Sequence, residues 1–249
     1  MTTSSAKPKK KHKVWQIILV SGSAFFVVVA SSFLIYAAFY YHASDVSSSL
    51  KSDDQVTVKQ EGNISFIPEN PKAGFVFYPG AKVEEKAYAP LCHSLAEKGV
   101  YTILIKMPFH LAFFGIHKAQ GIPEDHKEIT SWYLGGHSLG GAMAASFLGK
   151  GNQGYAGLAL LGSYSTADLS KSGLKTTTLY GSEDKVLNQT SYANNLKNLP
   201  SANIETVIEG GNHSGYAYYG PQKGDGTATI SKDEQISFTS TALVTCMGI

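Results

Sequence analysis

The sequence predicts an α/β protein in which helices cover both faces of a mostly parallel β-sheet. From about residue 56 to the end, short runs of β-branched and aromatic residues alternate with helix-like stretches, and this alternation is typical of parallel strands joined by helical crossovers. The 249 residues are enough for one sizeable domain. A long uncharged apolar segment precedes this region, so we expect one additional helix outside the sheet domain.

The N-terminal part has the pattern of a membrane anchor. Residues 1–13 contain five lysines and no acid, and residues 14–41 contain no charge. About 20 apolar residues span a bilayer, and lysines before such a segment favour a cytoplasmic N-terminus. We therefore predict a basic cytoplasmic N-terminus (1–13), a transmembrane signal anchor (14–41), a polar, serine-rich linker (42–55) and the α/β domain (56–249).

A cleaved signal peptide is the alternative interpretation of residues 14–41. Signal peptides have a shorter apolar region that ends in a small-residue cleavage site, and this segment fits that pattern less well. Both interpretations send the remainder of the chain across the membrane. That remainder contains no arginine and more acids than lysines, which argues against a nucleic-acid partner.

The elements of the domain follow one another at short intervals. The predicted strands, of which the first range is a strand pair, are residues 56–68, 73–80, 100–108, 131–138, 155–164, 175–184 and 202–213. The predicted helices are residues 84–98, 139–149, 189–199 and 232–247. In such sheets, functional side chains gather at the carboxyl ends of the strands.

Ser138 has the sequence context of an activated nucleophile. It lies in Gly136-His137-Ser138-Leu139-Gly140, which matches the pattern G-x-S-x-G between an apolar β-type run and an alanine-rich helix. A sharp strand-to-helix turn strains the serine and requires small flanking residues. The first turn of the helix also offers backbone N–H groups to a developing oxyanion.

An acid and a base follow Ser138 at later strand ends. Asp184 ends the strand at 175–184, and His213 ends the strand at 202–213. Ser, Asp and His in this order, each at a strand end, are the residue types of a nucleophile with its base and orienting acid. Glu183 is the alternative acid.

From residue 56 onward the chain resembles the α/β-hydrolases. The segments "GGHSLGG", "GSEDKV" and "GGNHSGYAYYGPQKGDGTATIS" resemble bacterial members related to dienelactone hydrolase (carboxymethylenebutenolidase), although true dienelactone hydrolases use a cysteine nucleophile. The resemblance implies that Ser138 attacks a carbonyl, His213 is the general base and Asp184 orients the imidazole. It also implies an oxyanion hole formed by the N–H groups of Leu139 and Ala81, with Lys82 as the alternative to Ala81.

The remaining motifs bear on metal binding, the substrate pocket and a cap domain. His137 packs beside the serine, Cys92 is a core residue of a helix, and the histidines show no metal-ligand spacing. The aromatic segment 107–117 either lines a substrate pocket or packs in the core. The short connection 165–175 leaves no room for a large cap domain.

We therefore predict a membrane-anchored serine hydrolase that acts on small carboxylic esters at the outer face of the cell membrane. It needs no cofactor, metal or nucleic acid, and the sequence does not specify an oligomeric state. The alternatives are a peptidase or amidase of the same fold and a non-catalytic surface binding module.

Overall fold

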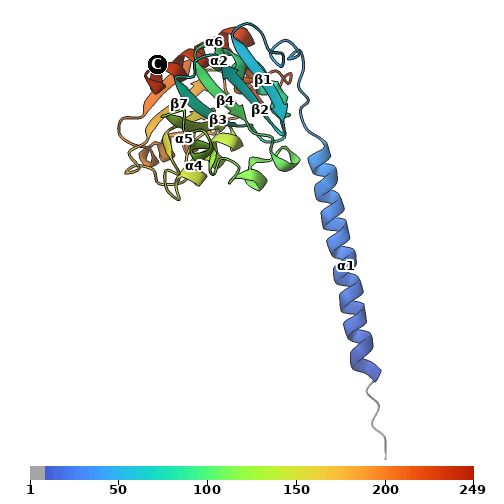
Figure 1. Ribbon diagram of the computed structural model, residues 1–249. Helices are drawn as coiled ribbons and strands as arrows, with labels where there is room; N and C mark the ends of the chain where they lie inside the picture. Colours follow the sequence, from blue (N-terminus) through green and yellow to red (C-terminus); the bar gives the residue numbers. More distant parts are fainter. Residues whose placement is uncertain (1–8) are drawn as a thin grey trace, which may run out of the picture. The chain divides into compact units, whose positions relative to one another are not determined.

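The computed structural model describes residues 9–249, with side chains from Trp15 onward except that of Ile17. The chain forms two compact units, Met1–Phe39 and Tyr40–Ile249. Figure 1 shows the long helix of the first unit and the sheet of the second. Residues 1–8, which belong to the predicted cytoplasmic N-terminus, lie outside the described residues.

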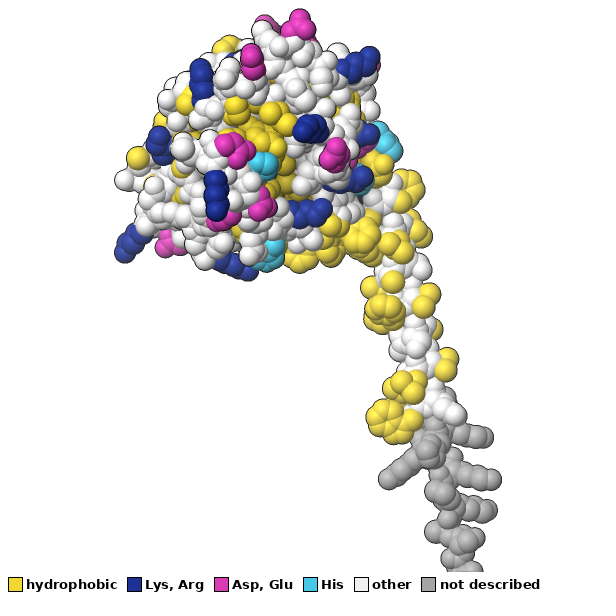
Figure 2. Space-filling view, viewed as in Figure 1, with side chains coloured by type: hydrophobic (Ala, Val, Ile, Leu, Met, Phe, Trp, Pro, Cys, Tyr) yellow, Lys and Arg dark blue, Asp and Glu magenta, His cyan; other side chains and the backbone are white. Residues whose placement is uncertain are grey.

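Helix α1 (Lys9–Ala38) is long and apolar enough to cross a membrane. Its segment Ile18–Ala38 has a mean hydropathy of 2.3. At 1.5 Å per residue these 21 residues rise about 30 Å, which matches the hydrocarbon core of a bilayer. Figure 2 shows hydrophobic side chains along this helix.

The second unit contains an eight-stranded sheet in the order β1-β2-β4-β3-β5-β6-β7-β8. β2 pairs antiparallel with β1 and β4, and the other neighbours are parallel. The predicted mostly parallel sheet is therefore confirmed. The strands are β1 (Val56–Glu61), β2 (Asn63–Pro68), β3 (Ala73–Tyr78), β4 (Val100–Leu104), β5 (Trp132–His137), β6 (Tyr155–Leu161), β7 (Lys175–Gly181) and β8 (Ile204–Ile208).

Helices cover both faces of this sheet, and each face has its own apolar core. α2 (Ala89–Glu97) and α6 (Lys232–Met247) pack together on one face, while α4 (Leu139–Leu148) packs on the other (Figure 1). The remaining helices are η1 (Glu85–Tyr88), η2 (Pro108–His110), η3 (Ala112–Gly115), α3 (Ile122–Asp125), α5 (Gln189–Asn195), η4 (Leu196–Asn198) and η5 (His213–Tyr216).

The elements differ from the predicted ones mainly at their ends. The helix expected at 84–98 begins as the 3₁₀-helix η1, and its α-helical part starts only at Ala89, with Pro90 in the first turn, where proline's fixed φ is favourable. Cys92 is fully buried in α2, as predicted, and both cysteines are free thiols. The parallel strands end earlier than expected because the apolar residues continue into buried loops.

Two connections bear on access to the strand ends. Residues 42–55, which are polar in sequence and were expected to be a linker, pack on the second unit: Val46 is buried, and Leu50 packs against the core. Between β6 and β7 only residues 162–174 intervene, so no large cap domain enters there. Ser138 is accordingly half-buried rather than covered.

Candidate active site

Ser138 occupies a strained turn between β5 and α4. Its φ of 52° and ψ of −123° place a residue with a side chain in the left-handed half of backbone space, which costs free energy and recurs at active sites. Its N–H donates to the Leu161 carbonyl at 2.9 Å, and its own carbonyl accepts from Ser163 Oγ at 2.7 Å. Neighbouring β6 and its loop therefore hold the turn in place.

Two glycines allow this turn to lie against the end of β3. A Cβ atom on Gly136 would collide with the Tyr78 carbonyl oxygen, and one on Gly140 would collide with the carbonyls of Tyr78 and Pro79. Backbone cannot move aside as a flexible side chain can. The close approach of β3 is therefore the physical reason for glycine at both positions.

His213 and Asp184 form a buried pair at the same edge of the sheet. His213 Nδ1 lies 2.8 Å from Asp184 Oδ2, and the two side chains are 2 % and 0 % exposed. Asp184 Oδ1 accepts the backbone N–H groups of Val186 and Leu187 at 2.9 and 2.8 Å. Since an ionised carboxylate only accepts hydrogen bonds, Nδ1 carries the proton and Nε2 presents its lone pair.

Glu183, the alternative acid, does not take part in this pair. Its carboxylate accepts from the neighbouring Ser182 hydroxyl at 3.4 Å. The structure thus places Asp184, and not Glu183, beside the histidine.

Ser138 and His213 border one cavity of about 280 Å³. His213 Nε2 is buried and has no hydrogen-bond partner among the described residues, so its lone pair is available. The cavity is lined by Ser138, Leu139, Ala142, Gly162, Ser163, Tyr164, Val186, Leu187, Asn188 and His213. None of the aromatic residues of segment 107–117 is in this lining.

The backbone N–H groups after Pro79 have different partners. Gly80 N–H donates to the Tyr88 hydroxyl at 3.0 Å, and Lys82 N–H donates to the His110 carbonyl at 2.7 Å. Ala81 N–H donates to no acceptor within residues 9–249. Leu139 begins α4, so its N–H lacks an intrahelical acceptor. Of the three predicted oxyanion donors, Leu139 and Ala81 therefore have N–H groups without an acceptor among the described residues, whereas the Lys82 N–H has one.

The sequence pattern of the α/β hydrolase family matches residues 74–237. The chain belongs to the α/β hydrolase family. Comparison with curated proteins finds no sequence match.

Solved structures share the fold of this α/β hydrolase at low sequence identity. A protein from Thermus thermophilus aligns with a TM-score of 0.61 at 15% identity, over 78% of this chain and 99% of its own. Carboxyl esterase 2 from Tuber melanosporum aligns with a TM-score of 0.59 at 13% identity, over 83% and 91%. Est1E from Butyrivibrio proteoclasticus, solved with ferulic acid bound, aligns with a TM-score of 0.57 at 12% identity, over 80% and 98%.

A buried hydrogen-bond chain connects the loop after β3 to the elbow of the hydrolase. The Tyr88 hydroxyl accepts from Gly80 N–H and lies 2.8 Å from His137 Nδ1. Burial raises the Tyr88 pKa and holds the His137 pKa well below its usual value, so Tyr88 stays protonated and donates to a neutral imidazole. The His137 ring packs 4.4 Å from that of His213 between centroids. The sequence showed His137 as a packing neighbour but gave no sign of Tyr88.

Asp225 is a second residue that sequence reasoning missed. Its carboxylate accepts the backbone N–H groups of His213 at 3.2 Å and Ser214 at 2.8 Å, and that of its own neighbour Gly226 at 2.8 Å. The Asp-Gly pair within "KGDG" was the available signal, because such pairs form turns. The turn holds the backbone of the histidine-bearing loop.

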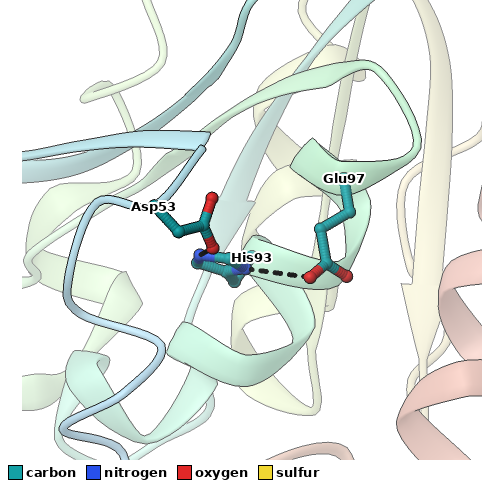
Figure 3. Close-up of side chains that lie close together, drawn as sticks. All are labelled: Asp53, His93 and Glu97. Atoms are coloured by element: carbon teal, nitrogen blue, oxygen red, sulfur yellow. Dashed lines mark ion pairs between the residues drawn. The ribbon is translucent and has the colours of Figure 1, made fainter. Parts of the chain in front are cut away.

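Away from this site, Asp53, His93 and Glu97 form a cluster that includes possible metal ligands (Figure 3). Asp53 Oδ2 lies 3.3 Å from His93 Nε2, whereas Glu97 Oε1 lies 3.6 Å from His93 Nδ1. One ligand atom of each residue lies within 4.8 Å of the other two, while the ion-pair contacts join Asp53 and Glu97 to different imidazole nitrogens of His93. This arrangement favours an ion-pair contact that fastens residue 53 to α2.

Proposed function

We propose that this α/β hydrolase is a serine carboxylic-ester hydrolase with Ser138 as its nucleophile. One observation carries the proposal: His213, hydrogen-bonded to the buried Asp184, borders the same cavity as a serine in a strained turn. Nucleophile, base and orienting acid are the three groups that acyl transfer through a covalent intermediate requires.

The mechanism follows from the positions of these groups. Ser138 Oγ attacks the ester carbonyl while His213 Nε2 takes its proton, and Asp184 stabilises the resulting imidazolium through Nδ1. The N–H groups of Leu139 and Ala81 donate to the oxyanion. His213 then gives its proton to the leaving alcohol, which leaves an acyl group on Ser138. A water molecule, deprotonated by His213, hydrolyses this ester and releases the acid.

Small esters are the substrates that the site favours. The cavity is about 280 Å³, and within residues 40–249 the short connection 162–174 contributes no cap domain over it, so a short acyl group can enter from solvent. A structural neighbour named as a carboxyl esterase supports ester rather than amide hydrolysis. The serine also favours simple esters over the dienelactones that cysteine enzymes hydrolyse.

The proposed location is the outer face of the cell membrane. α1 contains a segment long and apolar enough to span a bilayer, and the lysines that precede it favour a cytoplasmic N-terminus. This orientation puts the hydrolase unit outside the cell, attached to the membrane by its N-terminal helix.

Hydrolysis of p-nitrophenyl acetate by the detergent-solubilised full chain tests this proposal. We expect Ser138→Ala to lower kcat/KM at least about 10³-fold, because only binding and oxyanion stabilisation remain without the nucleophile. Ser146→Ala, two turns further along α4, is the matched control and should retain the wild-type rate. Equal rates for the two variants would refute the role of Ser138.

A further inference from the structure

We propose that the loop Pro108–Gly115 is a membrane-docking surface that holds the hydrolase unit against the phospholipid bilayer in which α1 is anchored. The inference rests on the membrane anchorage proposed above and does not depend on the ester chemistry. Its core is an aromatic cluster, which we define as Phe109, Phe113 and Phe114.

The aromatic cluster exposes a large apolar area to solvent. Phe109, Phe113 and Phe114 are 45%, 65% and 46% exposed, and the Phe114 ring packs edge-on against the other two at 5.4 and 5.3 Å. Exposed apolar groups that gather in one place mark interaction surfaces, whereas single ones are ordinary. Apolar side chains of this kind also insert into the boundary between lipid headgroups and acyl chains.

Buried residues of the loop and its flank anchor it to the core of the hydrolase unit. Met107 and Ala112 are buried in the core on the α4 face of the sheet, so the phenyl groups are not displaced core residues. Phe109 and His110 both have positive φ, at 55° and 52°. Two consecutive strained residues cost free energy, and here they fix the backbone from which Phe109 projects.

The chain path brings this loop near the point where α1 ends. The Tyr40 ring stacks on the His110 ring, with centroids 3.9 Å apart. Tyr40 follows Ala38, the last residue of α1, by two positions, so their Cα atoms lie within about 7 Å whatever orientation the two units adopt. If α1 spans the membrane, His110 therefore lies close to the membrane surface.

The charges around the loop suit an anionic lipid surface. From Lys106 to Lys118 the chain contains two lysines and no acid, and Lys118 Nζ donates to the Lys106 carbonyl at 2.8 Å. Lysines near a membrane are attracted to anionic headgroups. Two acids lie near His110: the buried Glu85, 3.7 Å from His110 Nδ1, and Glu84, whose carboxylate accepts the Ala43 N–H at 3.0 Å. Neither acid belongs to the lysine-flanked segment 106–118.

Quenching by brominated lipid tests the docking surface in the full chain. The protein is reconstituted into vesicles of phosphatidylcholine and phosphatidylglycerol, with and without bromine on the acyl chains. Phe113→Trp is made in a Trp15→Phe background because Trp15 belongs to α1, whereas Trp132 is buried in the core. The matched control is Phe238→Trp in the same background, since Phe238 is 60% exposed on α6, across the sheet from the loop.

We expect the fluorescence of the tryptophan introduced by Phe113→Trp to fall about two-fold in brominated vesicles. Interfacial side chains lie ~5–10 Å below the headgroup boundary, where bromine on the acyl chains can quench them. The fluorescence of the tryptophan introduced by Phe238→Trp should be the same in both kinds of vesicle. Vesicle flotation shows whether the protein is bound to the membrane. If the protein floats but the fluorescence of Phe113→Trp is not quenched, the docking surface is wrong. If the protein does not float, the membrane anchorage on which the docking surface rests is wrong. Hydrolysis of p-nitrophenyl acetate in the same samples tests the proposed enzymatic function separately.

Discussion

Tyr88→Phe removes one oxygen atom and breaks the buried chain that joins the loop after β3 to the elbow. In the structure the Tyr88 hydroxyl is fully buried and has two partners, Gly80 N–H and His137 Nδ1. The phenylalanine ring fills the same space but satisfies neither partner. The variant therefore tests whether this chain stabilises the fold and positions the adjacent Ala81 N–H.

The expected magnitude follows from the two groups left without a partner. A buried polar group that loses its hydrogen bond costs about 1–3 kcal/mol, so for two such groups we expect the free energy of unfolding to fall by about 2–6 kcal/mol. For a domain of this size that corresponds to a Tm lower by about 4–24 °C. The loop that carries Ala81 loses a fixed point, so kcat should fall about tenfold, which is about 1.4 kcal/mol of activation free energy.

Thermal unfolding in detergent and the rate of p-nitrophenyl acetate hydrolysis measure both effects. The matched control is Tyr101→Phe, because Tyr101 is also buried but its hydroxyl makes no hydrogen bond within the described part of the chain. We expect that control to change the free energy of unfolding by less than about 0.5 kcal/mol. If both variants show the same Tm and kcat, the reasoning about the buried chain is wrong.

Three further predictions concern Asp184, Asp225, which holds the His213 loop, and the neutral His137. Asp184→Asn should lower kcat about 10⁴-fold while circular dichroism stays unchanged, because the amide disfavours the required His213 tautomer; a loss under tenfold would contradict this. Asp225→Ala removes the acceptor of the His213 and Ser214 N–H groups and should lower kcat about tenfold, so an unchanged kcat would exclude a positioning role. Since burial lowers the His137 pKa in the folded state, the unfolded chain binds the extra proton. Stability should therefore fall as the pH drops below about 6.5, by up to about 1.4 kcal/mol per pH unit. Denaturant unfolding between pH 7 and 5 should show a flatter dependence for His137→Gln, and an equal slope would refute this source of acid sensitivity.

The fold class and the main strand-end residues were accessible from the sequence because their signals are local. The alternation of apolar runs and helical stretches specifies a parallel sheet without knowledge of distant contacts. Ser138, Asp184 and His213 each follow an apolar run, and parallel strands bring their carboxyl ends to one edge. The structure places the latter two 2.8 Å apart between Oδ2 and Nδ1.

The supporting contacts were not accessible, because they depend on residues far apart in the chain. Tyr88 and His137 are separated by 49 positions, and no local pattern pairs a tyrosine on a short helix with an elbow histidine. The choice between Ala81 and Lys82 was open for a similar reason. The Lys82 N–H donates to the carbonyl of His110, a residue 28 positions further along the chain, and no local pattern predicts that contact. Residues 42–55 are mostly polar in sequence and therefore resembled a linker. Val46 is buried only because distant parts of the chain form the core against which it packs.

Covalent labelling by a fluorophosphonate probe tests the central claim most directly. The probe reacts with a serine that is activated by a base, and peptide mass spectrometry locates the modified residue. We predict stoichiometric modification of Ser138 in the wild-type full chain and none in Ser138→Ala. Absence of labelling in the wild type, or labelling that persists in the variant, would contradict the assignment of Ser138 as the nucleophile.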